Sequence, residues 1–290
     1  MKAFGYAYAK VNISLDVVSK MSDGYHNMKM VMQTVSLVDD ITVECTPGEG
    51  MRVESGLPFV PSDDRNIAAK AALAFYKHTN ITGYKTIIKM KKRIPVCAGL
   101  GGGSSDGACV LRLMDEMFET KLSRKTLESI GCEIGSDVPF CIDGGTSLAE
   151  GRGEILTNLT PIKPCHIVIC KPAFSCSTPV LFGRLNAEKI RRRPDTQGLI
   201  EALGANDLNG VAHRMYNVFE DVLPRGQREI AEIKNTILDT GALGTVMTGS
   251  GPSVIGLFDN EEYAKNAHIQ LSRSYKECFL TETVERLGYH

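Results

Sequence analysis

The sequence predicts an α+β fold built from two domains. Strand-like and helix-like segments are mixed along the chain rather than strictly alternating, which favours α+β over a doubly wound parallel sheet. A length of 290 residues is enough for two medium-sized domains. Threonines and prolines interrupt the pattern at residues 155–165, and a new strand-like run begins at residue 167. We therefore expect an N-terminal domain over residues 1–158 and a C-terminal domain over residues 159–290.

The N-terminal half begins with segments that read as strands and then a helix. Apolar and polar side chains alternate over residues 11–17, which predicts a half-buried strand with Lys10 and Asn12 on its polar face. The run at residues 30–45 predicts one or two further strands, so the chain starts as an antiparallel meander. An alanine-rich stretch at residues 66–77 has helical periodicity and predicts a helix.

A glycine-rich stretch at residues 95–107 separates the next strand from the next helix. The apolar residues within 104–122 have helical spacing, and we expect Ser104 or Ser105 as the N-cap with Asp106 in the first turn. The other elements that we expect are a helix at 122–135, a strand pair toward the end of 136–154, a strand at 167–172, helices at 179–190, 227–240 and 261–273, and a loop at 246–258 between strand-like flanks.

The composition excludes several classes of protein. The 33 basic residues nearly balance the 34 acidic ones, so no net field favours nucleic acid or an anionic membrane. No uncharged apolar run reaches the roughly 18 residues that a membrane-spanning helix needs. The nine cysteines form no C-x-x-C pair, which fits reduced thiols better than disulfides or a zinc site. We expect a cytoplasmic protein, a monomer or weak homodimer, that acts on a small molecule.

The stretch at 95–107, PVCAGLGGGSSDG, is suited to hold an anion. Glycines let backbone N–H groups approach a ligand closely, and the N-terminus of the following helix adds unpaired N–H groups and a positive dipole end. Three common phosphate-binding patterns fit it poorly. The Walker A pattern needs a lysine after the glycines, the dinucleotide fingerprint finds Ser104 at its last glycine position, and the protein-kinase motifs are absent.

Three segments together resemble the GHMP small-molecule kinases. The glycine stretch matches P-x-x-x-G-L-G-[GS]-[GS]-S-S, residues 9–12 match A-K-[IV]-N, and residues 248–252 match a G-S-G-P-type loop, in the family's order. The resemblance implies the two-domain GHMP kinase fold. That fold joins an N-terminal domain like the second domain of a small-subunit ribosomal protein to a C-terminal α/β-plait domain, with the active site in the cleft between them. ATP as phosphoryl donor and Mg²⁺ are implied as well.

The same resemblance implies roles for individual residues. Asp137, which we expect in a loop, corresponds to the catalytic base; Lys10 is expected to keep it ionised and to steady charge on the phosphoryl group. Asn12 is expected to bond the acceptor hydroxyls. The ATP-binding loop is expected to comprise Pro95, Val96, Cys97, Ala98, Gly99, Leu100, Gly101, Gly102, Gly103, Ser104 and Ser105, and the third-motif loop Gly249, Ser250 and Gly251.

The acceptor is suggested by three further segments, at residues 23–28, 135–154 and 177–182. They resemble a branch of the superfamily that phosphorylates the 2-hydroxyl of a cytidine diphosphate-linked methylerythritol, in the synthesis of isoprenoid precursors. This resemblance implies that cytosine is held by Tyr25, His26 and Phe182, and that Thr178 contacts the substrate diphosphate.

Some features depart from the family or stay open. Cys97 stands where a small residue is usual, and Gly107 replaces the usual alanine, which should weaken the helix start by about 0.5 to 1 kcal/mol. The protein ligand of Mg²⁺ is open among Ser104, Ser105 and Asp106. Two other functions are open: another GHMP kinase of the homoserine or mevalonate type, and a nucleotide-binding regulator without catalysis.

Overall fold

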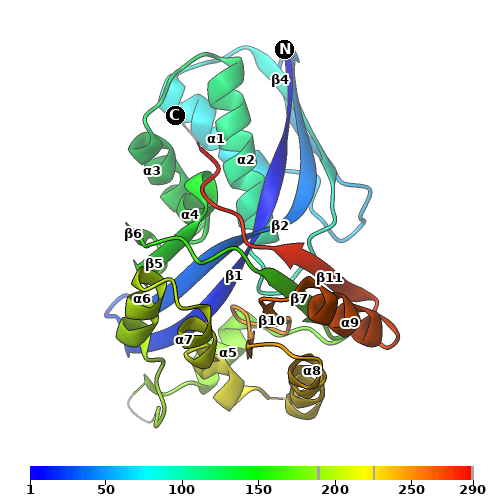
Figure 1. Cartoon of the computed structure of the whole chain (residues 1–290). Helices are drawn as coiled ribbons and strands as arrows, with labels where there is room; N and C mark the ends of the chain where they lie inside the picture. The colour runs from blue at the N-terminus through cyan, green and yellow to red at the C-terminus, as the bar shows by residue number, and fades with distance from the viewer. Residues whose placement is uncertain (188–189, 225, 289–290) are drawn as a thin grey trace.

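The computed structural model describes residues 1–187, 190–224 and 226–288, and it contains two sheets (Figure 1). The larger sheet has the order β3-β4-β2-β1-β8, and β5 pairs with β2 and β6 with β5. Its strands are β1 (Lys2–Lys20), β2 (His26–Pro47), β3 (Met51–Glu54), β4 (Tyr84–Lys91), β5 (Thr146–Gly151), β6 (Ile155–Asn158) and β8 (Tyr216–Asn217). The antiparallel pairing of β1 with β2 confirms the predicted meander, and the 30–45 run forms a single long strand.

The smaller sheet comes from the C-terminal half of the chain, with the order β11-β7-β10-β9 and antiparallel neighbours throughout. Its strands are β7 (His166–Lys171), β9 (Gly244–Met247), β10 (Val254–Phe258) and β11 (Glu277–Glu282). The helices α8 (Gln227–Asp239) and α9 (Glu261–Ser272) pack on this sheet, which confirms the two helices predicted there.

The other helices come from the N-terminal half or from residues 178–222, between β7 and β9 in the sequence. They are α1 (Ile67–Thr79), α2 (Gly102–Met117), α3 (Arg124–Ile134), α4 (Val138–Asp143), α5 (Thr178–Arg184), α6 (Thr196–Gly204), α7 (Leu208–His213) and a 3₁₀ helix at Val218–Val222. Figure 1 shows α1 and α2 side by side, and α2 packs against β1. The predicted helix at 179–190 ends at Arg184, and residues 188–189 lie outside the described residues.

The prediction of a half-buried first strand is wrong for its middle part. Every residue from 9 to 17 is buried, because both faces of β1 are covered there. Ala7 and Leu15 belong to a core cluster that includes α2, whereas Val11 and Ile13 pack with apolar residues of the C-terminal half. The polar side chains of this strand therefore lie inside the protein.

Two local predictions near the glycine stretch also need correction. The helix α2 begins at Gly102, with Gly101 at the N-cap position and φ of +66°, so neither Ser104 nor Ser105 is the N-cap. The Ser105 hydroxyl instead donates to the Tyr8 carbonyl at 2.6 Å and ties α2 to β1. Asp137, predicted in a loop, is the N-cap residue of the short helix α4, whose first turn contains a proline.

The C-terminal segment and the strand β8 tie the two halves together. The segment after β11 returns to the N-terminal half, where the Leu287 N–H donates to the Asp143 carbonyl at 2.8 Å (Figure 1). The strand β8, from the C-terminal half, pairs in parallel with Ser14 and Leu15 of β1.

The boundary at residue 158 stays a prediction. Across the described residues, no helix is long and apolar enough to cross a membrane.

Candidate active site

Two cavities meet at the glycine loop. The first, of about 490 Å³, is lined by residues 94–104, by Lys92 and Asp106 behind them, and on the opposite side by Phe59, Val60, Pro61, Arg65, Asn66 and Ile67. The second, of about 610 Å³, contains Lys10, Asp137, Tyr25, His26 and Phe182 in its wall. Both walls include Gly99, Gly101, Ser104 and Thr178. A ligand in one cavity therefore lies next to a ligand in the other.

The three sequence motifs converge through backbone contacts at this junction. A Cβ atom on Gly99, whose φ is +78°, would lie 2.2 Å from the Thr248 carbonyl oxygen, and one on Gly249 would lie 2.7 Å from the Gly99 carbonyl oxygen. The Lys10 N–H donates to the Leu100 carbonyl at 3.0 Å. Only glycine fits where the second and third motifs touch, so the spacing of the two loops is set by their backbones.

The N-terminus of α2 opens at the first cavity. The helix has 16 residues and no side-chain cap, so its first N–H groups are available to a ligand. Together with the positive end of the helix dipole, these groups make the loop an anion site. All the predicted ATP-binding residues from Pro95 to Ser104 line this cavity; Ser105 does not, because its side chain is bonded to Tyr8.

A buried lysine and a carboxylate lie beside the junction. The Lys10 Nζ lies 3.3 Å from Asp137 Oδ2 and donates to Asn12 Oδ1 at 2.7 Å. The Lys10 side chain is only 5% exposed, whereas that of Asp137 is 31% exposed and so reachable by a ligand. The Lys10 side chain runs across Gly101, where a Cβ would lie 2.8 Å from Lys10 Cγ. The predicted grouping of Lys10, Asn12 and Asp137 is present in the structure.

The third-motif loop contacts the group of Lys10, Asn12 and Asp137 through Asn12. The Asn12 N–H donates to Thr248 Oγ1 at 2.8 Å, and the Thr178 hydroxyl donates to Ser250 Oγ at 2.8 Å. Thr178 is the first residue of α5, so this bond brings α5 to the third-motif loop. Thr178, Gly249 and Ser250 all line the second cavity, but Gly251 does not.

Aromatic rings gather at the other end of the second cavity. The rings of His26 and Phe182 stack with centroids 4.6 Å apart, and Phe182 meets the edge of Phe219 at 5.0 Å. Tyr25 is 56% exposed, with the Arg152 guanidinium 4.0 Å from its ring centroid. Burial, together with the charge of Lys20, lowers the pKa of His26, so its ring is neutral at pH 7 with one donor and one acceptor nitrogen.

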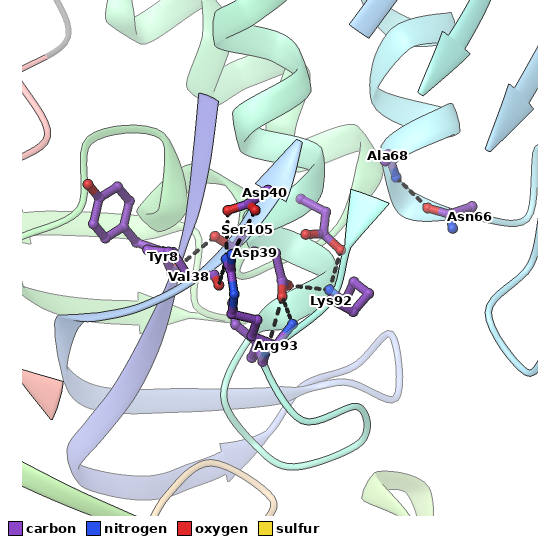
Figure 2. Close-up of polar contacts among 11 residues, drawn as sticks. Tyr8, Val38, Asp39, Asp40, Asn66, Ala68, Lys92, Arg93 and Ser105 are labelled. Carbon is purple, nitrogen blue, oxygen red and sulfur yellow. Dashed lines mark hydrogen bonds and ion pairs between the residues drawn. The ribbon is translucent and has the colours of Figure 1, made fainter. Parts of the chain in front are cut away.

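A buried ionic cluster behind the loop was not expected from the sequence. Lys92 Nζ lies 2.5 Å from both Asp39 Oδ2 and Asp106 Oδ2, and Asp39 Oδ1 accepts from the Ile94 N–H at 2.9 Å. Figure 2 shows Lys92 and Asp39 turned toward each other. The cluster joins the residues before the glycine loop to the helix after it. Nothing in the local pattern of Lys92 distinguishes it from its neighbours Lys91 and Arg93, which is why sequence reasoning missed it.

The charges in this cluster depend on one another. Burial raises the pKa of Asp106 to about 7, against the attraction of Lys92. Burial also disfavours the charged form of Lys92, but the carboxylates of Asp106 and Asp39 outweigh it and raise the pKa of Lys92. Lys92 therefore stays charged, and the Asp106 carboxyl has a pKa close to neutral pH.

The structure explains one of the two departures from the family pattern, Gly107, and gives no reason for a cysteine at position 97. At Gly107, an added Cβ would lie 2.9 Å from Ile67 Cγ2, so glycine lets α2 pack closely on the start of α1. Cys97 has a φ of +54°, a conformation that favours glycine, and its side chain is exposed in the wall of the first cavity.

The metal site is not a preformed cluster. In the ranges that the structure describes, no three His, Cys, Asp or Glu side chains are grouped to hold a metal ion. Among the three residues left open by the sequence, Ser105 bonds to Tyr8 and Asp106 to Lys92, whereas Ser104 lines both cavities.

Models of two domains match the chain. The model of the GHMP kinases N terminal domain matches residues 66–145, and that of the GHMP kinases C terminal domain matches residues 199–277. A 4-diphosphocytidyl-2-C-methyl-D-erythritol kinase of Clostridium beijerinckii is 44% identical over 278 residues, 96% of this chain and 99% of its own length. One of Acetivibrio thermocellus is 44% identical over 281 residues, 96% of this chain and 98% of its own length.

Solved structures give the same result at the level of the fold. A crystal structure of 4-(cytidine 5'-diphospho)-2C-methyl-D-erythritol kinase has a TM-score of 0.82 at 28% identity, covering 97% of this chain and 99% of its own. Homoserine kinase from Cytophaga hutchinsonii has a TM-score of 0.76 at 19% identity, covering 98% and 95%. The predicted GHMP kinase fold is confirmed. With relatives this similar over their whole length, the chain belongs to the GHMP kinases, in the family of the 4-diphosphocytidyl-2-C-methyl-D-erythritol kinases.

Proposed function

We propose that the protein transfers the γ-phosphoryl group of ATP to the 2-hydroxyl of 4-diphosphocytidyl-2-C-methyl-D-erythritol, giving the 2-phosphate and ADP. The observation that carries this proposal is the Lys10–Asp137 pair, 3.3 Å apart, beside the wall that the two cavities share. A kinase must bring a donor and an acceptor together next to a proton acceptor. The names of the relatives, at 44% identity, support the choice of acceptor and a role in the synthesis of isoprenoid precursors.

ATP binds in the first cavity, with its phosphates on the glycine loop and on the first turn of α2. The backbone N–H groups of residues 99–104 neutralise phosphate charge there, as the open N-terminus of α2 permits. Mg²⁺ would be held mainly by phosphate oxygens and water, with Ser104 at hand in both cavity walls, since magnesium keeps several waters and the described residues group no three His, Cys, Asp or Glu side chains to hold a metal ion. When bound, the ion neutralises charge on the phosphates.

Asp137 accepts the proton of the acceptor hydroxyl. Its carboxylate is partly exposed to the second cavity, and the Lys10 ammonium beside it favours the ionised form. Lys10 also lies under Gly101, which places its positive charge next to the loop that holds the phosphates. Asn12 orients Lys10 through its bond to Nζ, but its own amide donates to Met30 Sδ at 3.4 Å, and Asn12 is buried and lines neither cavity, so the structure does not place it against the acceptor as expected.

The cytidine end of the acceptor binds at the aromatic cluster. Phe182 and Tyr25 provide ring faces for the base, and the neutral His26 ring can both donate to and accept from a base edge. Thr178, which lines both cavities, is placed to contact the diphosphate. A kinase for homoserine or mevalonate has no base to bind, so this cluster favours the cytidyl acceptor over those alternatives. The cytoplasmic location and the monomeric or weakly dimeric state stay predictions.

Identification of the product by ³¹P NMR tests the proposal. Incubation with ATP, Mg²⁺ and the cytidyl acceptor should give one new phosphomonoester signal. This signal should be a singlet, because carbon 2 carries no proton that could split it. A doublet or triplet would place the phosphate on a different hydroxyl. Hydrolysis of ATP without a new phosphomonoester would contradict the proposed transfer.

A further inference from the structure

Residues 216–220, YNVFE, form a short segment beside the second cavity, whose wall includes Phe219, and none of the sequence motifs includes this segment. The segment comes from the C-terminal half of the chain. Tyr216 and Asn217 pair in parallel with Ser14 and Leu15, just beyond Asn12 on β1. A 3₁₀ helix follows directly at Val218–Val222. The segment therefore connects β1, the strand that carries Lys10, to the groups that the side chains of residues 216–220 contact.

The side chain of Asn217 is fully occupied by the backbone around it. Its Nδ2 donates to the carbonyls of Met247 at 2.7 Å and Gly249 at 2.8 Å, and its Oδ1 accepts from the Phe219 N–H at 3.0 Å. The residue is 1% exposed. A carboxamide with both amide protons and its oxygen bonded has one orientation, so Asn217 fixes the end of β9 and the start of the third-motif loop. Glu220 adds a second hold, because its Oε1 accepts from the Met247 N–H at 2.8 Å.

The loop that Asn217 holds touches both candidate substrate sites. On one side the Gly249 backbone packs directly on Gly99 of the phosphate loop. On the other side Ser250 accepts from Thr178 and lines the acceptor cavity. A displacement of Gly249 would move the walls of both cavities relative to Lys10.

The same segment also supports the aromatic cluster. Phe219, two residues after Asn217, meets Phe182 edge-on at 5.0 Å, and Phe182 stacks on His26 at 4.6 Å. Phe219 is itself buried and lies in the wall of the acceptor cavity. In this short segment, Asn217 thus holds the third-motif loop and Phe219 supports the stacked rings of Phe182 and His26.

We infer that Asn217 is a positioning residue of the phosphoryl transfer, which aligns donor and acceptor by holding the Gly249 carbonyl and with it the wall between the two cavities. The inference rests on the proposed function, which identifies the donor and the acceptor that are aligned. The three hydrogen bonds of the Asn217 side chain provide the means of alignment. Misplacement of reacting groups by about 1 Å costs on the order of a hundredfold in rate. Loss of the hold should therefore lower kcat more than it raises KM for either substrate.

The test is Asn217→Ser. A serine still caps the 3₁₀ helix by accepting from the Phe219 N–H, but it cannot donate to the two carbonyls. We expect kcat to fall by about 10- to 100-fold, with KM for ATP within about threefold of wild type. Asn217→Asp places a carboxylate oxygen against the two carbonyls, and we expect a larger fall in kcat.

The chain offers a matched control in Asn260→Ser. Asn260 caps α9 by accepting from the Glu262 and Tyr263 N–H groups, and it lines neither cavity. This variant makes the same substitution at a helix cap whose only role is to accept from backbone N–H groups, which serine can also do, so it should leave kcat at the wild-type value. If Asn217→Ser has the kcat of Asn260→Ser, the residue is structural only and the inference is overturned.

A second measurement does not depend on activity. Hydrogen exchange followed by mass spectrometry should show faster exchange in Asn217→Ser for the peptide that covers residues 245–255, where the Gly251 N–H donates to the Thr248 carbonyl. Asn260→Ser should leave that peptide unchanged. Unchanged exchange in Asn217→Ser would overturn the inference even if the wild-type protein used another acceptor, whereas failure of wild type to phosphorylate the cytidyl acceptor would overturn the proposed function alone.

Discussion

At the scale of single residues, the proposed chemistry depends on a lysine that is almost out of contact with water. A buried ammonium is costly unless it is paired, and Lys10 has Asn12 at 2.7 Å and Asp137 at 3.3 Å. Only Asp137 of these partners is exposed to a ligand. The pair therefore presents one carboxylate to the acceptor while the lysine charge is held in place behind it.

We predict that Asp137→Asn lowers the rate of phosphoryl transfer by about 10²- to 10⁴-fold, since it removes the proton acceptor and keeps the shape. Lys10→Ala should be similarly inactive. ATP affinity should change little in Asp137→Asn, because Asp137 is not in the wall of the nucleotide cavity. Single-turnover rates and calorimetric titration with ATP measure both quantities, and a transfer rate within tenfold of wild type would refute the assigned role.

We predict that His26→Ala lowers kcat/KM for the cytidyl acceptor by about 1 to 3 kcal/mol, the cost of leaving polar groups of the base unpaired. The kinetic parameters for ATP should stay close to wild type. The variant should also discriminate less between the cytidine acceptor and its uridine analogue. Tyr25→Leu is the comparison, since loss of stacking should weaken both acceptors about equally. An unchanged base preference in His26→Ala would argue against a cytosine-reading role.

At the scale of elements, the glycine loop is held at both ends. The cluster of Asp39, Lys92 and Asp106 fixes the strand before it to the helix after it, and the Gly99–Gly249 contact fixes its middle. A loop held in this way is preorganised for an anion, so little ordering cost remains when a nucleotide binds.

Gly101→Val is predicted to weaken ATP binding by about tenfold or more. At the φ of +66° a branched residue is strained by about 1 to 3 kcal/mol. Its Cβ would lie 2.8 Å from Lys10 Cγ and would push the Lys10 side chain aside. The transfer rate should fall too, because Lys10 moves. Gly204→Ala is the matched control, since nothing lies within 4 Å of an added Cβ there. Calorimetry with ATP that gave the same affinity in folded Gly101→Val and Gly204→Ala would rule out the phosphate-loop assignment.

Asp106 gives a prediction for stability against pH. Its pKa is about 7 in the folded protein and 3.8 in a reference carboxyl, so between these values the folded state binds the extra proton. The contribution to stability is fully present below pH 3.8 and is lost as pH rises through 7. From pH 5 to 6.5 the free energy of unfolding of wild type, relative to Asp106→Asn, should fall by about 1 kcal/mol per pH unit. Urea denaturation that gives a constant difference would contradict the assigned pKa.

Sequence patterns predicted what depends on local backbone chemistry. Gly99 and Gly101 mark the loop because their positive φ values favour glycine and an added Cβ would meet Thr248 or Lys10, and the 227–240 and 261–273 helices follow from apolar spacing. The start of α2 was misplaced because a left-handed glycine, rather than a serine, precedes it. Contacts across long separations, such as Lys92 with Asp39 or Asn217 with Gly249, leave no local pattern and needed the structure.

At the scale of the whole molecule, one strand links all parts of the site. Along β1, Lys10 and Asn12 lie between the phosphate loop and the third-motif loop, and Leu15 lies in the wall of the acceptor cavity. Both faces of this stretch are covered, one by the helices of the N-terminal half and one by the C-terminal half. The site therefore forms only when the two halves of the chain pack together, and its acceptor cavity uses residues from both.

The second cavity is proposed to select a cytidine diphosphate-linked acceptor. ADP release by the purified protein with ATP and Mg²⁺, measured against 4-diphosphocytidyl-2-C-methyl-D-erythritol, homoserine and mevalonate in turn, tests it most directly. We expect saturable turnover with the cytidyl acceptor and only background ADP release with the other two. Turnover of homoserine or mevalonate with none of the cytidyl acceptor would contradict it.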